Sequence, residues 1–359
     1  MAVGDTAGHV LPALAIAEAY REAWSDVDVA FLAADDGPAR RLVTAAGYSL
    51  HVVPATPLVR VGVLGRIVGA IRVVPTIAVA RRVLKSRDAR LVIGTGGAAS
   101  GGAVLAARSL GLPTAIVEPN AVPGLANHLL RRIAQRVYVT FDSAASGFPP
   151  GRALKTGLPL RASRASVLRN RIPPSPGRPV HLFVTGGSRG DAFLAAQIPV
   201  LTARLQEAGL SLEVRHQVAA IDPGVVAQRY SQLHIHAQVL PFLDDITDAY
   251  DWADMIIARA GAGTIAELAL AGVPSLLVPL ADAAADHQAA NATAFADMGA
   301  CMWVREDDWA PDHVAARMIE VLGTPAAWTA MSSAARAFAT PHAARDIVDD
   351  CERLMDSRW

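Results

Sequence analysis

Short apolar segments alternate with stretches of helical spacing along most of the chain. Short apolar runs bounded by glycine, proline and polar residues are typical of strands buried in a parallel sheet. With the helical patterns between them, they predict an α/β fold containing doubly wound parallel sheets. In chain order the predicted strands are Asp28–Ala33, Arg90–Ile93, Thr114–Val117, Arg136–Thr140, Val180–Thr185, Leu212–Val218, Gln238–Phe242, Met255–Ala258, Ser275–Leu280 and Cys301–Arg305.

The strand–helix pattern occurs twice, which indicates two domains. At 359 residues the chain is longer than one typical domain. We place the boundary near Gly157, so that residues 1–157 form a first Rossmann-like domain and residues 158–342 a second. The amphipathic pattern within 343–359 predicts a last helix that packs back on the first domain.

Glycine-rich loops precede helical patterns near the front of each half. In the first half, Gly4–His9 follows only three apolar residues, and Gly94–Gly102 follows a predicted strand. In the second half the corresponding loop is Gly186–Gly190. Free backbone N–H groups at the beginning of a helix suit a phosphate group. The first loop lacks the Gly-x-Gly-x-x-Gly pattern of dinucleotide-binding folds, which argues against a nicotinamide-dependent dehydrogenase.

The stretch Arg259–Asn291 contains the most informative polar residues. A helix over about 264–271 carries one acid, Glu267, in its first turn, and a polar cluster follows the next strand. Ligands of open α/β sheets bind outside the carboxyl ends of the strands. Because a carboxylate can pair with two hydroxyls, we interpret the stretch as a sugar or nucleoside site. An ordinary strand–helix–strand unit with a capped helix is the alternative. The polar cluster consists of Asp286, His287, Gln288 and Asn291.

The segment Thr56–Arg87 combines apolar and basic residues. It has seven Lys or Arg side chains and no acid between Arg60 and Lys85. An apolar surface with basic flanks is typical of a protein that lies on an anionic membrane. A pair of buried helices with solvated arginines is the other interpretation.

Composition excludes several classes of protein. Lys plus Arg (33) equal Asp plus Glu (33), so no global basic field favours nucleic acid. Two cysteines are too few for a disulfide framework. No apolar run is long enough for a membrane span, and no signal peptide is evident, so we expect a protein that is neither secreted nor membrane-spanning. His234 and His236 alternate with apolar residues, which favours a solvated strand face over a metal site.

A set of short motifs occurs in a fixed order along nearly the whole chain. They are Thr6-x-Gly8-His9-Val10, Gly96-Gly97 to Ser100-Gly101, Glu118 with Asn120, Gly124-Leu125-x-Asn127, Gly157-x-Pro159-x-Arg161, Gly186-Gly187-Ser188-x-Gly190, Arg259 to Thr264 with Glu267, and Asp286-His287-Gln288 with Asn291. Together they resemble the MurG family, which transfers N-acetylglucosamine from UDP-N-acetylglucosamine (UDP-GlcNAc) to lipid I, giving lipid II for peptidoglycan. The resemblance implies the GT-B fold: two Rossmann-like domains that face a central cleft.

The resemblance also implies roles for individual residues. His9 and Glu118 would be catalytic, with His9 acting near the acceptor hydroxyl. Glu267 would hold the ribose of the donor, and Leu243 would meet the uracil through its backbone. The implied donor-binding residues are Arg161, Gly187, Ser188, Leu243, Ala262, Gly263, Thr264, Glu267, Gln288 and Asn291. The implied acceptor-binding residues are Thr6, Gly8, Gly97, Ser100, Asn120 and Asn127.

An inverting transfer is consistent with these residue types. An imidazole is a suitable base for the acceptor 4-hydroxyl at neutral pH. Helix N-termini and Arg161 would stabilise the leaving UDP, so we expect no metal and no cofactor. The expected partners are UDP-GlcNAc, a polyprenyl-diphosphate lipid acceptor and an anionic membrane surface bound through residues 58–87, with no nucleic acid. The implied location is peripheral, on the cytoplasmic face of the bacterial plasma (inner) membrane.

The first loop departs from the family's usual Gly-Gly-Thr-Gly-Gly-His. Asp5 and Ala7 replace two of its glycines, and Ala98, Pro119 and Asp191 are further departures. Two alternatives therefore stay open. One is a divergent UDP-sugar glycosyltransferase with another lipid or a secondary-metabolite acceptor. The other is a scaffold that binds nucleotide sugar without turnover.

Overall fold

The computed structural model describes nine stretches of the chain. They are residues 1–34, 38–54, 63–161, 171–175, 177–187, 191–219, 221–241, 243 and 246–356, without the side chains of 63–72 and 284. The chain forms two compact units: Met1–Ala165 with Thr340–Trp359, and Ser166–Ala339. The boundary predicted at residue 157 lies a few residues before this division.

Unit 1 is built around parallel strands covered by helices. The strands β3, β4, β5 and β6 form a sheet in that order, and β1 pairs with β2. The first residues of the chain link the two groups, because Ala2 bridges to both Leu32 and Gly94. The strands are β1 (Ala30–Ala33), β2 (Ser49–Val52), β3 (Val92–Gly94), β4 (Thr114–Glu118), β5 (Arg136–Val139) and β6 (Ala153–Lys155).

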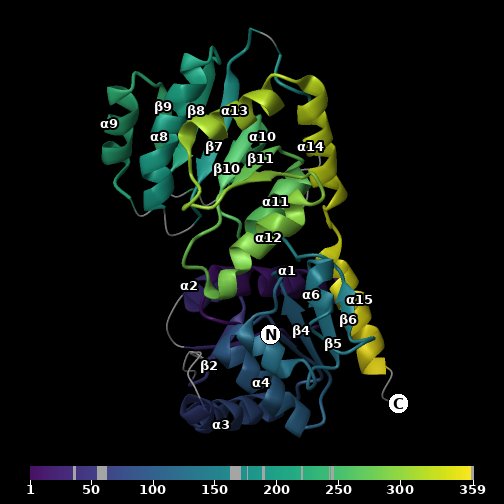
Figure 1. The fold of residues 1–359 in the computed structure, drawn as a ribbon. Helices are drawn as coiled ribbons and strands as arrows, with labels where there is room; N and C mark the ends of the chain where they lie inside the picture. The colour runs from purple at the N-terminus through teal and green to yellow at the C-terminus, as the bar shows by residue number, and fades with distance from the viewer. Residues whose placement is uncertain are drawn as a thin grey trace. The chain divides into compact units, whose positions relative to one another are not determined.

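The helices of unit 1 include the end of the chain. Figure 1 shows α15 in yellow beside the purple and blue elements of this unit. Asp350 on α15 accepts hydrogen bonds from Arg136 Nε (2.6 Å) and Tyr138 Oη (3.0 Å) on β5. The helices are α1 (Ala7–Ala23), α2 (Pro38–Ala45), α3 (Val63–Ser86), α4 (Gly97–Ser109), α5 (Leu125–Leu130), α6 (Asp142–Ala145) and α15 (Ala343–Asp356).

Unit 2 contains a six-stranded parallel sheet with the order β12-β11-β10-β7-β8-β9. This is the strand order of a dinucleotide-binding fold, in which the order of the parallel strands reverses between β7 and β10. The strands are β7 (Val180–Thr185), β8 (Leu212–Gln217), β9 (Ala237–Leu240), β10 (Met255–Ala258), β11 (Ser275–Leu277) and β12 (Met302–Trp303). The α-helices are α8 (Ala192–Glu207), α9 (Pro223–Gln232), α10 (Thr247–Trp252), α11 (Ala262–Ala271), α12 (His287–Ala296), α13 (Pro311–Leu322) and α14 (Pro325–Ala337).

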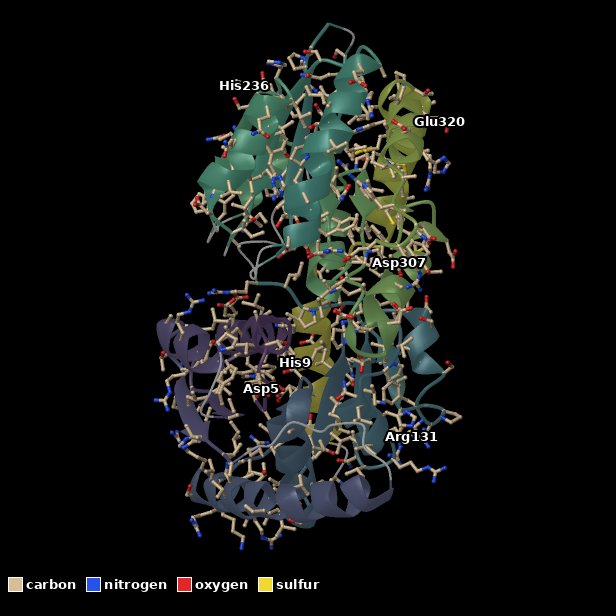
Figure 2. All side chains as sticks on the ribbon, turned by 60° about the vertical axis from the view of Figure 1, so that its left-hand side comes forward. Asp5, His9, Arg131, His236, Asp307 and Glu320 are labelled. Atoms are coloured by element: carbon tan, nitrogen blue, oxygen red, sulfur yellow. The ribbon has the colours of Figure 1, made fainter. Side chains whose placement is uncertain are left out.

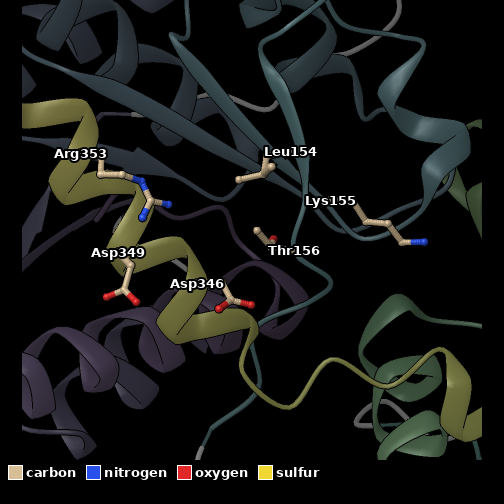
Figure 3. Close-up of a pocket in the computed structure, with 6 residues that line it drawn as sticks. All are labelled: Leu154, Lys155, Thr156, Asp346, Asp349 and Arg353. Atoms are coloured by element: carbon tan, nitrogen blue, oxygen red, sulfur yellow. The ribbon is translucent and has the colours of Figure 1, made fainter. Parts of the chain in front are cut away.

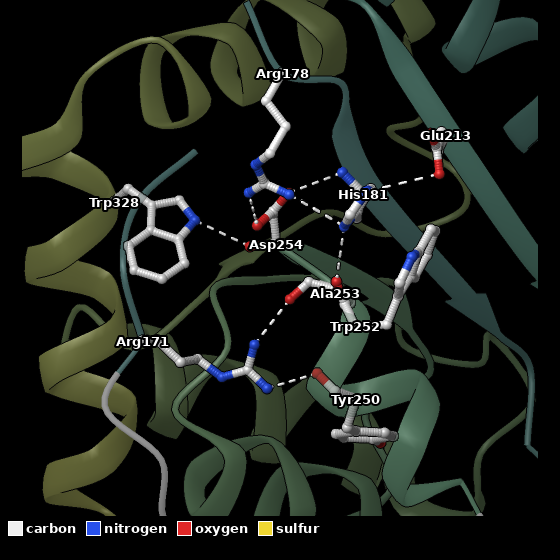
Figure 4. A network of polar contacts seen from close by, with 9 residues as sticks. All are labelled: Arg171, Arg178, His181, Glu213, Tyr250, Trp252, Ala253, Asp254 and Trp328. Carbon is white, nitrogen blue, oxygen red and sulfur yellow. Dashed lines mark hydrogen bonds and ion pairs between the residues drawn. The ribbon is translucent and has the colours of Figure 1, made fainter. Parts of the chain in front are cut away.

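A polar network secures the amino-terminal edge of the unit 2 sheet (Figure 4). Asp254, just before β10, accepts bonds from Arg178 Nη2 (2.6 Å) and from the backbone N–H of His181 (2.9 Å). Arg171 donates to the Tyr250 (2.5 Å), Ala253 (2.8 Å) and Ala271 (2.5 Å) carbonyls, which lie at or beside the carboxyl ends of α10 and α11. Carbonyls at helix ends lack intrahelical partners, so this arginine satisfies groups that would otherwise need water. The network lies at the edge opposite to the ligand-binding edge of such folds.

Candidate functional site

The first two glycine loops meet around one imidazole in unit 1. A Cβ atom on Gly4 would lie 2.5 Å from His9 Nδ1, and one on Gly96 would lie 2.8 Å from His9 Nε2. A Cβ on Gly97 would lie 2.5 Å from the Cα of Gly4. Gly96 and Gly97 also have positive φ angles, +108° and +79°. Only glycine fits both the contact and the backbone here.

His9 lies inside the first turn of α1, because the helix begins at Ala7. The predicted loop Gly4–His9 is therefore shorter than expected. Thr6 is the N-cap residue, but its hydroxyl makes no cap bond. Instead Thr6 Oγ1 lies 3.2 Å from His9 Nδ1, and Thr95 Oγ1 donates to the His9 carbonyl at 2.7 Å. Figure 2 shows the His9 side chain near Asp5, which is half-buried.

Ser100 lies under the second glycine loop. Its side chain is fully buried, and its Oγ accepts the Gly96 N–H at 3.3 Å. Ser100 therefore stabilises the conformation of this loop through its bond to Gly96. Gly8, in contrast, is exposed in the first turn of α1.

Glu118 ends β4, the neighbour of β3 in the sheet. Its side chain is 1% exposed. Both carboxylate oxygens accept hydrogen bonds, from the backbone N–H groups of Asn120 and Gly124 and from the Asn120 and Asn127 side chains. Burial raises the pKa of Glu118, and these hydrogen bonds oppose the rise. Asn127 is itself 3% exposed.

Arg161 belongs to unit 1 and pairs with an acid of α1. Its Nη2 lies 2.5 Å from Glu18 Oε1, and its Nε donates to the same oxygen at 2.8 Å. The sequence offered no signal for this pair, since the two residues are far apart in the chain. The role predicted for Arg161 at the diphosphate stays a prediction.

In unit 2 the predicted donor loops follow β7 and β10, the strands at the switch point. Gly187 has φ +78°, and its N–H donates to Thr185 Oγ1 at 3.2 Å. Helix α11 begins at Ala262, so Ala262, Gly263 and Thr264 form its first turn. Its N-cap residue Gly261 provides no side-chain cap. Ser188 lies outside the described residues, and Leu243 is half-buried.

The three polar side chains predicted to read the nucleotide sugar differ in burial. Glu267 is half-buried on α11, where Tyr250 Oη donates to its Oε2 at 3.3 Å. Gln288 Oε1 accepts the Leu280 N–H at 3.0 Å. Asn291 is fully buried, and its Nδ2 donates to the Ala260 carbonyl at 3.2 Å. Asn291 thus stabilises the loop before α11 from the protein interior.

Arg259 is a structural centre that received no role in the sequence analysis. It is 6% exposed and donates to both oxygens of Asp191, at 2.8 Å from Nη2 to Oδ1. Its Nη1 donates to the Val278 carbonyl (3.0 Å) and lies 2.7 Å from Glu306 Oε1. Asp191 also caps α8 by accepting the Leu194 N–H at 2.8 Å. The departure from the family pattern at Asp191 therefore supplies the partner of a buried arginine.

Metal ligation receives no support from the described residues. No group of three or more His, Cys, Asp or Glu side chains with suitable geometry occurs among them.

A cavity of about 300 Å³ lies between β6 and α15 (Figure 3). Its lining carries both signs of charge, and none of the predicted site residues contributes to it. The lining residues are Leu154, Lys155, Thr156, Asp346, Asp349 and Arg353.

Comparison with known proteins identifies the family. Residues 1–139 match the glycosyltransferase family 28 N-terminal domain, and residues 181–349 match the C-terminal domain. A Magnetococcus marinus UDP-N-acetylglucosamine–N-acetylmuramyl-(pentapeptide) pyrophosphoryl-undecaprenol N-acetylglucosamine transferase is 37% identical over 97% of this chain and 95% of its own. A Sorangium cellulosum protein of the same name is 38% identical over 99% of this chain and 87% of its own. The crystal structure of Acinetobacter baumannii MurG matches with a TM-score of 0.81 and 30% identity, covering 98% of both chains.

The chain belongs to the MurG family. The predicted family and the predicted GT-B fold, with two parallel-sheet α/β units, are thereby confirmed. The fold alone is shared more widely: the glycosyltransferase of kitacinnamycin has a TM-score of 0.71 at 18% identity. Within the described part of the chain, no helix has the length and apolar character that crossing a membrane requires.

Proposed function

We propose that this protein is an inverting N-acetylglucosaminyltransferase of peptidoglycan synthesis. It moves N-acetylglucosamine from UDP-GlcNAc to the 4-hydroxyl of undecaprenyl-diphosphate-MurNAc-pentapeptide, which is lipid I. The observation that carries the proposal is the 37% identity, over 97% of the chain, to a relative named for this transfer. Because both family 28 domains match, the likeness covers the acceptor half as well as the donor half.

The donor side is assigned to unit 2. The uncapped first turn of α11 presents the N–H groups of Ala262, Gly263 and Thr264 to an anion, which suits the diphosphate of UDP. Glu267 on the same helix has a carboxylate for the ribose hydroxyls. When the sugar–oxygen bond breaks, these N–H groups stabilise the charge that develops on UDP.

The acceptor side is assigned to the glycine loops around His9. The imidazole removes the proton of the acceptor 4-hydroxyl as its oxygen attacks C1 of the sugar. The bond between C1 and the β-phosphate oxygen of UDP breaks on the opposite side, so the configuration at C1 inverts. Because these N–H groups stabilise the charge on the leaving group by hydrogen bonding, the reaction needs no metal, and activity should survive chelation by EDTA.

The membrane face is assigned to the exposed side of α3. The opposite side of this helix packs on α4, where a Cβ on Gly102 would lie 2.4 Å from Thr76 Cγ2. Val74 (59% exposed), Arg82 and Lys85 lie outside. An apolar side chain followed by cations suits an anionic bilayer, which would place the protein peripherally on the cytoplasmic face of the plasma membrane, where the lipid acceptor lies. Replacing Arg82 and Lys85 by Glu should reduce flotation with anionic vesicles, and undiminished flotation would contradict this assignment.

Acceptor-dependent release of UDP tests the function. Purified protein should release UDP from UDP-GlcNAc only when a lipid I analogue is present. Release with a different acceptor would instead favour the divergent transferase. Tight binding of UDP without release on any acceptor would favour the scaffold.

A further inference from the structure

An acid that exchanges a proton with a substrate must be accessible to it, but the side chain of Glu118 is buried. It is the last residue of β4, at the same edge of the sheet as Gly96, which contacts His9. Its side chain is 1% exposed. A general acid or base must come within hydrogen-bond reach of the proton that it transfers. The surroundings of the carboxylate therefore decide what Glu118 can do.

Four donors surround the carboxylate, and all belong to the segment 120–127. Oε1 accepts the Asn120 N–H at 2.9 Å and the Asn120 Nδ2 at 3.4 Å. Oε2 accepts the Gly124 N–H and the Asn127 Nδ2, both at 2.9 Å. A carboxylate has about four lone-pair positions, so these bonds use its capacity.

The same bonds tie the loop to the strand at two points. Gly124 is the N-cap residue of α5, and Glu118 accepts its backbone N–H, the donor that the acid of a capping box would accept from within the helix. Asn127 Nδ2 also donates to the Val117 carbonyl at 2.9 Å, which anchors α5 to β4. The residues between these points, 119–123, cannot move away without breaking the contacts of Glu118.

Protonation would break this arrangement. All four donors are N–H groups, and a protonated carboxyl would direct its own O–H toward one of them. Proton uptake by Glu118 is therefore coupled to opening of the loop, which is unsuitable for a group that exchanges a proton in each turnover. His9, in contrast, is half-buried between the two glycine loops.

We propose that Glu118 is a positioning residue for the acceptor: its carboxylate holds the loop 119–124 and the beginning of α5 in place, and it does not transfer a proton. This role rests on the proposed function, because the loop lies at the sheet edge assigned to the acceptor. It replaces the catalytic role that the sequence implied for Glu118. Asn127 has the same positioning role, because its side chain bonds to both Glu118 and the Val117 carbonyl.

A double-mutant cycle with steady-state kinetics tests the proposal. Glu118→Gln keeps the size of the side chain but places an NH₂ group against N–H donors, and Asn127→Ala removes the second anchor. We expect each variant to raise the KM for the lipid I analogue about 10-fold or more, with the KM for UDP-GlcNAc within twofold of the wild-type value. The double variant should be little worse than either single one, because both break one unit. Glu320→Gln, at an exposed acid of α13, is the matched control.

The pH profile separates positioning from proton transfer. If Glu118 only positions the loop, the pH dependence of kcat in Glu118→Gln keeps the limbs of the wild type. Any one of three results would overturn the proposal: loss of one limb of the pH profile of kcat in Glu118→Gln, an unchanged KM for the lipid I analogue, or effects of the two substitutions that add in the double variant.

Hydrogen exchange gives an answer that is independent of activity. The Asn120 and Gly124 amides should exchange at least 10-fold faster in Glu118→Gln than in the wild type, while the amides of β4 keep their protection. Equal exchange at these two amides would overturn the proposal even in an active enzyme. If the wild type shows no acceptor-dependent release of UDP but the variant shows faster exchange, the proposed function is refuted. The role of Glu118 in holding the loop 119–124 is then still supported.

Discussion

Glu118 in unit 1 and Arg259 in unit 2 are both buried charged side chains at the ligand-binding edge of their sheets, and they differ in sign and in partners. Glu118 in unit 1 is an anion held by amide N–H groups. Arg259 in unit 2 is a cation held by two carboxylates, Asp191 and Glu306, and by backbone carbonyls. Glu118 ties the end of β4 to the segment that follows it, and Arg259 ties the end of β10 to the beginning of α8 and to the segment after β11. Neither is exposed enough to meet a substrate directly.

Within each site, the residues that hold the loops differ from those proposed to bind ligands. Buried charges fix the loops, while the groups proposed to meet ligands are helix N-termini and half-buried side chains such as His9 and Glu267. The anion of unit 1 depends on backbone N–H groups, so its loss should loosen one loop. The cation of unit 2 joins three elements, so its loss should weaken the fold of the whole unit.

The largest expected effect is on catalysis in unit 1. His9→Ala should lower kcat by roughly 10²–10⁴-fold, because the base is removed from the transition state. The KM for UDP-GlcNAc should stay near the wild-type value. His313→Ala, at an exposed histidine of α13, is the control. Unchanged turnover of His9→Ala would remove this residue from the role of base.

The buried cation of unit 2 gives the next effect. Arg259→Met leaves the buried Asp191 and the half-buried Glu306 without their partner, which should lower the free energy of unfolding by about 3–5 kcal/mol. Urea unfolding followed by tryptophan fluorescence measures this loss, since Trp252, Trp303 and Trp328 all lie in unit 2.

Two variants sharpen the interpretation of Arg259. Asp191→Asn should be less damaging than Arg259→Met, because Glu306 still pairs with the arginine and asparagine still caps α8. Arg204→Met, at an exposed arginine of α8, should leave unfolding unchanged. An Arg259→Met protein that is as stable as the wild type would contradict the structural role of this cation.

Donor binding should respond to Glu267. Glu267→Ala removes charged hydrogen bonds to the ribose and should raise the Kd for UDP about 10–100-fold. Tyr250→Phe removes only the hydroxyl that bonds to this carboxylate, so a smaller increase is expected. Isothermal titration with UDP measures both. Equal UDP affinity in the wild type and Glu267→Ala would refute the ribose assignment.

The smallest effect compares two glycines of unit 1. Gly96→Ala places a methyl group against the His9 ring at φ +108°, which should cost about 1–3 kcal/mol of stability. Gly101→Ala, inside α4 with open space around its Cβ position, should stabilise by about 0.5–1 kcal/mol. Thermal unfolding of both variants checks the difference. Similar behaviour of the two variants would contradict the tight contact at His9.

The fold class and the family could be predicted from the sequence, but the first residues of helices and the edge strands could not. The glycine loops were expected to extend to His9 and to Gly102, whereas α1 begins at Ala7 and α4 at Gly97. Packing between the loops stabilises helical turns that glycine by itself disfavours. The strands β2 and β6 were missed, because Ser49–Val52 and Ala153–Lys155 are short and partly exposed and lack a clear apolar run.

The site residues divide in the same way. Motif spacing could indicate His9, Glu267 and the helix N-termini, because local order along the chain determines them. Contacts between distant residues were invisible: Arg161 with Glu18, and Arg259 with Asp191. Burial was equally hidden, so Glu118 and Asn291 could be named as site residues without any sign that they lie beneath the surface.

The proposed transfer is tested by measuring the release of UDP from UDP-GlcNAc with and without a lipid I analogue. We expect release that depends on the analogue, and a product carrying one added N-acetylglucosamine with inverted configuration at C1. Donor binding without any release in the presence of the analogue would contradict it.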